Sequence, residues 1–222
     1  MEKLALAQQF RTYYRAKSQS EIVTFTEATY LSITGEGDPA TKIFSDKIGA
    51  LYASAYGIKF ACKASGQDFV MAKLEGLWWF DTNQYANLSA MEAPVQVPRD
   101  QWQWRLLIRV PGYVSQEMVN TVRKAVGQKK KLPLAAEVSL FTYTEGKVVQ
   151  MLHTDPFSTE PESLRKMEEF IAVNNLQRAG LHHKIYLSDF TKANPARLKT
   201  VLREPIGLMQ NTPKSPKGDF LT

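Results

Sequence analysis

Residues 69–80 have the sequence FVMAKLEGLWWF, whose apolar and aromatic character predicts a long β-strand. Upstream, residues 40–56 carry apolar side chains at helical spacing, which predicts an amphipathic helix. β-Branched and aromatic residues at 28–34 and 102–110 predict strands on either side of this pair. The first half of the chain therefore has the order strand, helix, strand, strand.

The second half repeats this order with different residues. Strands are predicted at 147–153, 182–189 and 205–209, and a helix at 161–175 follows the first of them. Two such units predict an α+β fold of two strand–helix–strand–strand modules with pseudo-two-fold symmetry. In this fold the sheet is antiparallel, its helices lie on one side, and a cleft separates the modules.

The domain organisation follows from the same patterns. We expect an N-terminal helix within residues 1–20, one domain over 21–210 and a flexible tail over 211–222, where Pro, Lys and Gly accumulate. Two local predictions are a β-hairpin over 138–152, with a turn at Glu145-Gly146, and a short helix over 195–202.

Composition narrows the classes of function. The 222 residues include 28 Lys+Arg and 22 Asp+Glu, a net charge of +6, and 44% hydrophobic residues, as in an ordinary globular protein. Cys62 is a lone cysteine and no apolar run is long enough for a membrane span, so we expect a cytoplasmic protein without a membrane partner. The basic excess keeps nucleic acid or gyrase as an alternative partner, although no groove-reading motif accompanies it.

Metal and cofactor motifs are weak in this sequence. His182 and His183 are neighbours in a predicted strand, so their side chains point to opposite faces and cannot share one metal ion. Residues 35–40, GEGDPA, match the letters of a dinucleotide fingerprint. Pro39 removes an N–H donor there and the two acidic residues repel phosphate, so we expect neither a metal nor a cofactor.

The strongest candidate for a site is a carboxylate in an aromatic strand. Glu75 stands inside the apolar sequence LEGLWWF, and a buried carboxylate must be paired, coordinated or protonated. It is either a structural ion-pair partner or a ligand contact. The adjacent indoles Trp78 and Trp79 are compatible with a protein core or with the walls of a site for a planar ligand. Residues 183–186, HKIY, repeat the placement of ionisable groups in an apolar strand.

Short motifs spread over most of the chain, from Tyr30 to Ile206, resemble those of stand-alone GyrI-like small-molecule-binding proteins. They are LEGLWW (74–79), IRVP (108–111), MLH (151–153), HHKIYLSD (182–189) and LKTVLREP (198–205). The resemblance implies two strand–helix–strand–strand modules with a groove between them. In this family the groove binds hydrophobic, often planar and cationic molecules through aromatic walls and an acidic residue. Relatives are ligand-sensing domains of multidrug-responsive regulators, hydrolases that open the cyclopropane of DNA-alkylating compounds, and a gyrase inhibitor.

One departure from the family pattern affects both ligand and chemistry. The family commonly reads HHEIYLSD, and this chain has Lys184 in place of the glutamate. The exchange of a carboxylate for an ammonium disfavours cationic ligands. It also removes a candidate general base, which argues against hydrolysis.

We therefore expect a protein that binds a hydrophobic, planar aromatic molecule, such as a drug or xenobiotic, in the cleft between the modules. Glu75 and Lys184 occupy corresponding strands, and we expect them to form an ion pair that favours neutral or zwitterionic ligands. In the alternative, a cyclopropanoid hydrolase, Glu75 directs water onto the substrate. The remaining expected ligand-binding residues are Trp78, Trp79, Tyr113, His183 and Tyr186.

Overall fold

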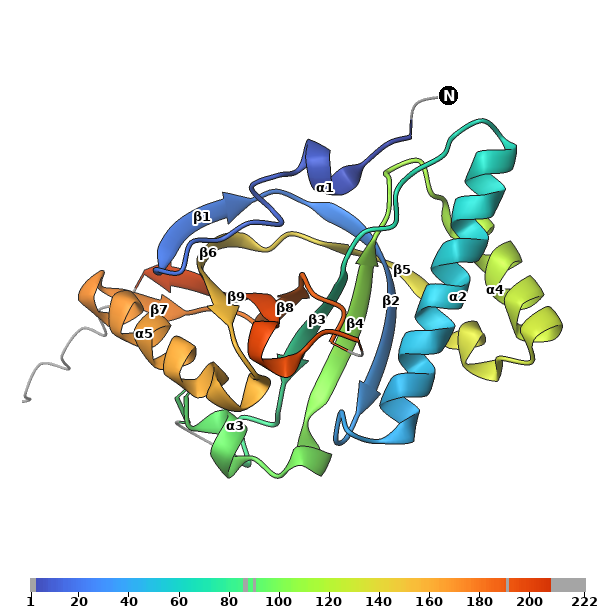
Figure 1. Cartoon of the computed structure of the whole chain (residues 1–222). Helices are drawn as coiled ribbons and strands as arrows, with labels where there is room; N and C mark the ends of the chain where they lie inside the picture. The colour runs from blue at the N-terminus through green and yellow to red at the C-terminus, as the bar shows by residue number, and fades with distance from the viewer. Residues whose placement is uncertain (1–2, 86–87, 90, 191, 209–222) are drawn as a thin grey trace, which may run out of the picture.

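The computed structural model describes residues 3–85, 88–89, 91–190 and 192–208. The predicted α+β fold with two strand–helix–strand–strand modules is confirmed (Figure 1). The first module consists of β2 (Ala28–Glu36), α2 (Lys42–Ala64), β3 (Leu74–Trp79) and β4 (Gln103–Arg109). The second consists of β6 (Gly146–Thr154), α5 (Glu160–Val173), β8 (His182–Tyr186) and β9 (Lys199–Leu208).

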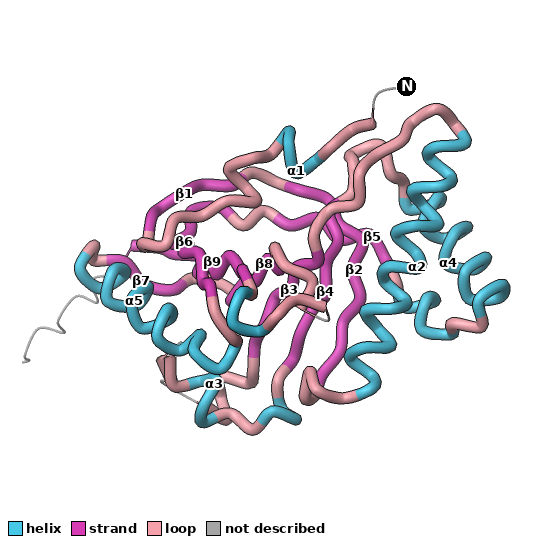
Figure 2. Tube along the Cα trace, viewed as in Figure 1, coloured by secondary structure: helices cyan, strands magenta, loops and turns pink. Residues whose placement is uncertain are grey.

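The two modules share one antiparallel sheet, which joins them at its centre. The strand order is β1-β6-β9-β8-β3-β4-β2-β5, so β3 of the first module pairs with β8 of the second, with Gly76 opposite Lys184. The edge strands β1 (Glu21–Phe25) and β5 (Ser139–Tyr143) are exchanged between modules. Each precedes one module in the sequence and pairs with the other, β1 with β6 and β5 with β2 (Figure 2).

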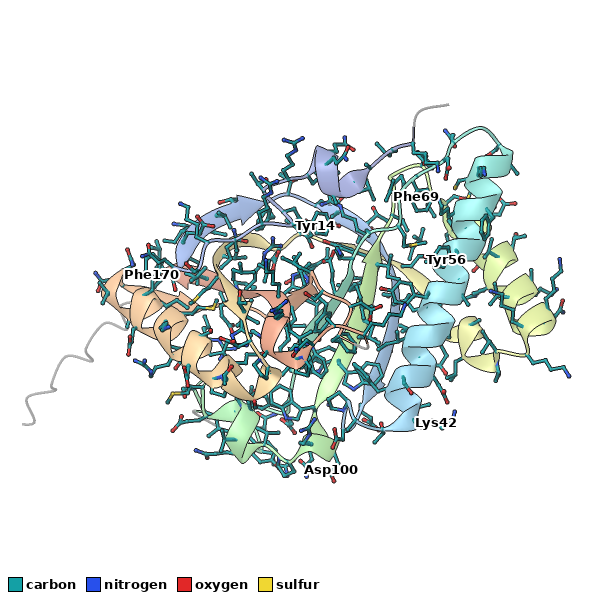
Figure 3. The ribbon with its side chains drawn as sticks, viewed as in Figure 1. Tyr14, Lys42, Tyr56, Phe69, Asp100 and Phe170 are labelled. Carbon is teal, nitrogen blue, oxygen red and sulfur yellow. The ribbon has the colours of Figure 1, made fainter. Side chains whose placement is uncertain are left out.

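The helices are held to the sheet by apolar stripes at helical spacing. In α2 the buried side chains include Phe44, Leu51, Ile58 and Cys62, and in α5 they include Leu164, Met167 and Ile171. Burying one such large apolar side chain contributes about 1.5–3 kcal/mol. Figure 1 shows α2 and α5 flanking the central strands. Both pack on the same face of the sheet, as predicted, α2 through Phe44 beside Trp78 and α5 through Leu164 beside Leu202. Figure 3 shows the side chains that pack between the helices and the sheet.

The remaining elements are short, apart from one helix. The helix α4 (Gln116–Lys130) packs against α2, where Met118 contacts Cys62. The strand β7 (Leu176–Arg178) pairs with the end of β9. The short helices are α1 (Leu6–Gln9) and α3 (Ala93–Gln96), and 3-10 turns lie at Arg99–Gln101, Pro133–Glu137, Phe157–Thr159 and Pro195–Arg197.

The prediction of a long N-terminal helix is wrong. Only Leu6–Gln9 is helical, and the following residues form turns. Tyr13 and Tyr14, which lie beyond this short helix, are both buried and direct their hydroxyl groups to Glu75. These hydrogen bonds to Glu75 stabilise a non-helical segment that packs on the sheet, in place of a continuous helix. The tail predicted at 211–222 lies outside the described residues.

The predicted β-hairpin over 138–152 is also wrong. Both strands exist, but β5 pairs with β2 and β6 pairs with β1 and β9. Glu145, expected in an exposed turn, is buried, and its carboxylate contacts His183 and Arg203. The chain therefore crosses from one module to the other at this point.

Several boundaries differ from the prediction; for example, α2 extends to Ala64, β8 ends at Tyr186 and β9 begins at Lys199. The helix α2 begins at Lys42 and not at residue 40, because Asp38 Oδ1 accepts a hydrogen bond from the Ala40 N–H in a turn before the helix. The strand β3 begins only at Leu74. The predicted helix over 195–202 is a single 3-10 turn followed by β9, whose buried side chains favour the sheet.

In the part of the chain that the structure describes, no helix combines the length and apolar character needed to cross a membrane.

Candidate functional site

A cavity of about 540 Å³ lies over the junction of β3 and β8. It is bounded by the start of α2, the start of α5 and the segment around α3, so both modules contribute to its wall. Aromatic rings form much of that wall. They include Phe44, Trp78, Trp102, Phe157, Tyr186 and Phe190.

The strand sequence explains how two of these rings reach the cavity. Side chains alternate along β3 and β8, so Trp78 and Tyr186 lie on the same face of the sheet as Gly76. A Cβ at Gly76 would lie 2.8 Å from Trp78 Nε1 and 3.5 Å from the Tyr186 hydroxyl oxygen. Glycine at this position therefore leaves room for both aromatic side chains above the strand.

The charged groups of the cavity are arranged in pairs. Lys184 Nζ contacts Glu160 Oε1, and both side chains are largely buried. Lys184 Nζ also lies 5.5 Å from the centre of the Trp78 ring. In a second group, His182 Nδ1 is 2.7 Å from Glu204 Oε1, and Arg178 Nε is 2.8 Å from Glu204 Oε2. The cavity thus contains charged side chains but little uncompensated charge.

Three buried polar atoms of the cavity wall have no hydrogen-bond partner among the described residues. They are Trp78 Nε1, Glu160 Oε2 and His182 Nε2. His182 Nε2 is 3.8 Å from Glu160 Oε1, so two of the three belong to one corner. Burying a polar group without a partner costs about 1–3 kcal/mol, so a ligand or water that satisfies these atoms gains that free energy.

Tyr186 adds a hydroxyl group to this wall. Burial and the negative charge of Glu160 raise the pKa of Tyr186 above its usual value. The phenol therefore keeps its proton, and its O–H group remains available as a donor.

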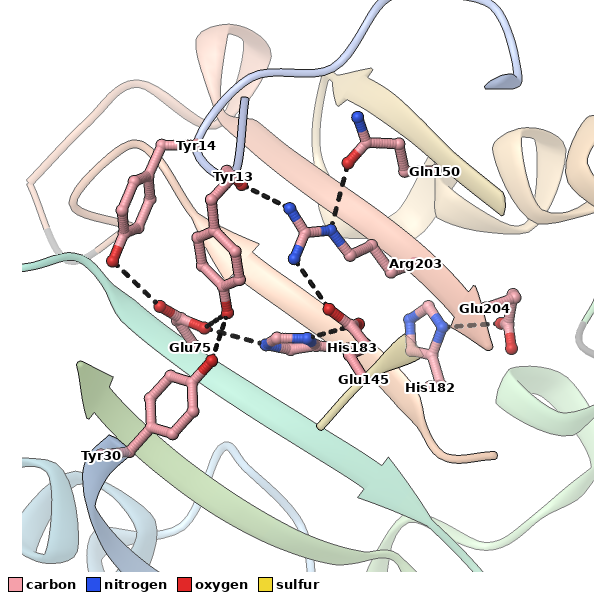
Figure 4. Close-up of polar contacts among 10 residues, drawn as sticks. All are labelled: Tyr13, Tyr14, Tyr30, Glu75, Glu145, Gln150, His182, His183, Arg203 and Glu204. Carbon is pink, nitrogen blue, oxygen red and sulfur yellow. Dashed lines mark hydrogen bonds and ion pairs between the residues drawn. The ribbon is translucent and has the colours of Figure 1, made fainter. Parts of the chain in front are cut away.

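The opposite face of the sheet carries a buried polar network around Glu75 and His183, and neither residue lines the cavity. Figure 4 shows this network together with the cavity residues His182 and Glu204. Glu75 is fully buried, and it accepts hydrogen bonds from Tyr13 at 2.5 Å and Tyr14 at 3.4 Å. Its Oε2 lies 3.0 Å from His183 Nε2. His183 Nδ1 in turn lies 2.8 Å from Glu145 Oε1.

Arg203 extends this network toward the edge of the sheet. Its Nη1 donates to Glu145 Oε2 at 2.9 Å, and its Nε donates to Gln150 Oε1 at 3.1 Å. Its Nη2 donates to the backbone oxygen of Tyr13. Because Gln150, Arg203 and His183 lie opposite one another on successive strands, the polar row crosses the second module and ends at Glu75.

The network fixes the charge of its central histidine. Complete burial alone lowers the pKa of His183, but Glu145 and Glu75 outweigh burial and raise the pKa to about 9. Burial would raise the pKa of Glu145, yet His183 and Arg203 hold it below its usual value. A buried imidazolium between two carboxylates, with Arg203 as a further cation, is a charge-balanced structural group.

The structure separates the predicted site residues into two sets. Trp78, Lys184 and Tyr186 line the cavity. Glu75 and His183 belong to the buried network, and the predicted ion pair between Glu75 and Lys184 is wrong, because Lys184 pairs with Glu160. Adjacent residues in a strand face opposite ways, so Gly76, and not Glu75, shares a face with its partner Lys184.

The two remaining predicted residues also lie away from the cavity wall. Trp79 packs on the opposite face beside Leu77, and its indole N–H donates to Gln103. Tyr113 lies before α4, and its hydroxyl group is 3.4 Å from the backbone oxygen of Gln67. Their expected roles in ligand binding remain predictions without support from this geometry.

Sequence reasoning missed three residues that reach the cavity, one each from α5, β8 and β9: Glu160, His182 and Glu204. Alternation in β8 could have placed His182 on the same face as Lys184 and Tyr186. Glu160 stands directly before Pro161, a sign of a helix start, but its proximity to Lys184 depends on tertiary packing. Within the described ranges, no group of three or more His, Cys, Asp or Glu is placed to hold a metal ion.

Comparisons with known proteins agree with this architecture. The sequence profile of the GyrI-like small molecule binding domain matches residues 18–206. A search of curated proteins found no match. An uncharacterized conserved protein from Listeria innocua is 31% identical, with a TM-score of 0.82, over 92% of this chain and 100% of that chain.

Two further structures extend the comparison. A protein from Listeria innocua described as a hydrolase is 31% identical, with a TM-score of 0.78, over 92% of this chain and 100% of that chain. The EcmrR C-terminal domain is 10% identical, with a TM-score of 0.52, over 86% of this chain and 98% of that chain, and shares the fold. Because the profile covers most of its length, the chain belongs to the family of GyrI-like small-molecule-binding domains.

Proposed function

We propose that the protein binds a hydrophobic, planar aromatic molecule, such as a drug or xenobiotic, in the cavity over β3 and β8. The observation that carries this proposal is the cavity itself, with aromatic rings from both modules in its wall. Its volume of about 540 Å³ falls within the range of small-molecule sites, roughly 300–1,000 Å³. Flat aromatic side chains offer extended surfaces for stacking against a planar ligand.

The charges of the cavity favour a ligand without net charge. Lys184 is paired with Glu160, Arg178 with Glu204, and Arg99 with Asp38. A lipophilic cation would find no unpaired carboxylate among these groups. An uncharged or zwitterionic molecule can stack on the rings without disrupting any of the three pairs.

Two neighbouring tryptophans provide a test with a matched control. Trp78 lines the cavity, whereas Trp79 lies on the opposite face of the same strand. Titration with planar aromatic compounds, followed by intrinsic fluorescence and calorimetry, should reveal saturable binding. We expect Trp78→Leu to weaken it by about tenfold or more and Trp79→Leu to leave it within about twofold. Equal losses in both variants would contradict the proposed location.

A second candidate function, hydrolysis, has one specific observation in its favour. Glu160 Oε2 is buried in the cavity wall without a partner, and a carboxylate in that position can accept a proton from water. Two Listeria innocua proteins of 31% and 32% identity are described as hydrolases. Glu75, by contrast, has its oxygens engaged by Tyr13, Tyr14 and His183 outside this wall.

The reaction can be written for a cyclopropane conjugated to a carbonyl group. The water oxygen bonds to a ring carbon while Glu160 accepts a proton from it. The breaking C–C bond leaves its electron pair on the conjugated carbonyl, which then takes up a proton. Incubation with a cyclopropane-bearing alkylating compound, followed by mass spectrometry, should show a product heavier by one water. Turnover that Glu160→Gln abolishes would favour hydrolysis, and saturable binding without product would favour binding alone.

A further inference from the structure

We infer that Glu160, His182 and Trp78 form a polar subsite that selects uncharged aromatic ligands carrying a hydrogen-bond donor, such as a hydroxyl, amide or arylamine group. This inference rests on the proposed function, because it specifies the ligand class of the same cavity. It is carried by the three unpartnered atoms, Glu160 Oε2, His182 Nε2 and Trp78 Nε1. The side chains of Glu160 and His182 are only 5% and 10% exposed, so bulk water does not readily satisfy them.

Glu160 is held as a fixed acceptor. It stands at the first position of α5, where the helix dipole stabilises a negative charge. Lys184 Nζ contacts only one of its oxygens, Oε1, and so leaves Oε2 directed elsewhere. The Lys184 ammonium neutralises the Glu160 carboxylate, while the second oxygen of the carboxylate remains able to accept hydrogen bonds. The result is a strong acceptor in a site of no net charge.

His182 supplies a second unpartnered polar atom. Its Nδ1 is 2.7 Å from Glu204 Oε1, and the ionised carboxylate can only accept, so Nδ1 carries the proton. Arg178 Nε donates to the other oxygen of Glu204 and keeps it in the ionised form. His182 Nε2 is directed to the same corner as Glu160 and has no hydrogen-bond partner among the described residues.

The balance of donors and acceptors defines the ligand class. Glu160 Oε2 is an ionised acceptor without a partner, and His182 Nε2 lies at the same corner. The donor of the subsite, the Trp78 indole N–H, lies beside the Tyr186 hydroxyl group, so the unmet requirement is for a donor. A ligand with a hydroxyl, amide or arylamine group can satisfy this corner, whereas a pure hydrocarbon leaves buried polar atoms without partners. A cation gains little, because Lys184 already neutralises Glu160.

The experiment compares two probes that differ by one donor, β-naphthol and its methyl ether. With the wild-type protein, we expect β-naphthol to bind about tenfold more tightly in calorimetry, because only its O–H group can donate a hydrogen bond to the Glu160 carboxylate. In Glu160→Gln this preference should fall to about twofold. Glu162→Gln is the matched control, because Glu162 lies in the same helical turn, is exposed and does not line the cavity.

A second variant tests the charge argument independently of Glu160→Gln. Lys184→Met leaves the Glu160 carboxylate without its cation, so we expect binding of the planar cation ethidium to strengthen by about tenfold. The inference would be overturned if wild-type protein bound β-naphthol and the ether with equal affinity, or if Lys184→Met bound ethidium no more tightly than wild type. Either result would leave the proposed function intact. If neither naphthalene probe bound the wild-type protein, the proposed function would fail together with the inference.

Discussion

His183 Nε2 lies 3.0 Å from Glu75 Oε2, and this contact spans the junction at which β8 of one module pairs with β3 of the other. Both side chains are fully buried. The contact therefore ties the modules together below the sheet, on the face opposite the cavity. It gives the adjacent residues His182 and His183 different roles, the first at the ligand cavity and the second in the interior.

The stability of the fold should depend on pH through His183. Burial opposes its positive charge, but Glu145 and Glu75 raise its pKa from 6.5 to about 9. A raised pKa contributes stability that is complete below pH 6.5, the unfolded value, and is lost as the pH rises through about 9. Denaturant unfolding across this range should show the free energy of unfolding decrease by a few kcal/mol, on the order of 1.4 kcal/mol per unit.

Two histidine variants test this assignment. In His183→Gln the pH dependence between neutral and alkaline conditions should disappear, although the protein is less stable throughout. His153→Gln removes another buried histidine, one that contacts Ser163, and should retain the dependence. The same slope in wild type and His183→Gln would contradict the role of His183.

Glu75 should be essential for stability and not for ligand chemistry. Replacing it with Leu removes the acceptor of His183 Nε2 and leaves two buried cations, His183 and Arg203, against the single carboxylate of Glu145. An uncompensated buried charge costs about 3–5 kcal/mol. Urea unfolding measures this loss, and Glu27→Leu, at an exposed position before β2, is the control. A Glu75→Gln variant of normal stability that no longer binds or converts a ligand would instead support the direct role expected from the sequence.

The two tyrosines beside Glu75 should differ in their contributions. Tyr13 donates to Glu75 at 2.5 Å and lies 2.8 Å from the hydroxyl group of Tyr30, whereas Tyr14 is 3.4 Å from Glu75. Tyr13→Phe should therefore cost about 1–3 kcal/mol of unfolding free energy, and Tyr14→Phe less than about 1 kcal/mol. Equal losses in denaturant unfolding would show that the longer contact is as important as the shorter one.

The sequence predicted the module order because each helix and strand has its own periodic spacing of apolar residues. This spacing can be recognised without knowing the tertiary contacts. The spacing of Phe44, Leu51 and Ile58 is a property of one helix, and the alternation around Trp78 is a property of one strand. The Glu145 turn was misread because strands near in sequence commonly form a hairpin. Its true position depends on His183 and Arg203, which are distant along the chain.

The candidate site was only partly predictable for the same reason. The positions of Trp78 and Tyr186 followed from aromatic residues in a strand, and both line the cavity. The predicted partner of Lys184 was wrong because it was inferred from equivalent positions in corresponding strands of the two modules. That comparison does not show which helix covers each face of the sheet. Glu160 approaches Lys184 only after α5 packs on the sheet, so the neutralisation of the cavity is a tertiary property.

Gly76 offers a test of the cavity that changes no polar group. In Gly76→Ala the new Cβ would lie 2.8 Å from Trp78 Nε1, so the indole must move from its position in the wall. We expect binding of a planar aromatic probe to weaken by about tenfold, since roughly 1.4 kcal/mol of stacking and fit is lost. Gly49→Ala in α2 is the matched control, because its Cβ meets no atom within 4 Å and alanine favours the helix. Isothermal titration of both variants with β-naphthol decides the matter, because unchanged affinity in Gly76→Ala would mean that the position of Trp78 does not control access to the cavity.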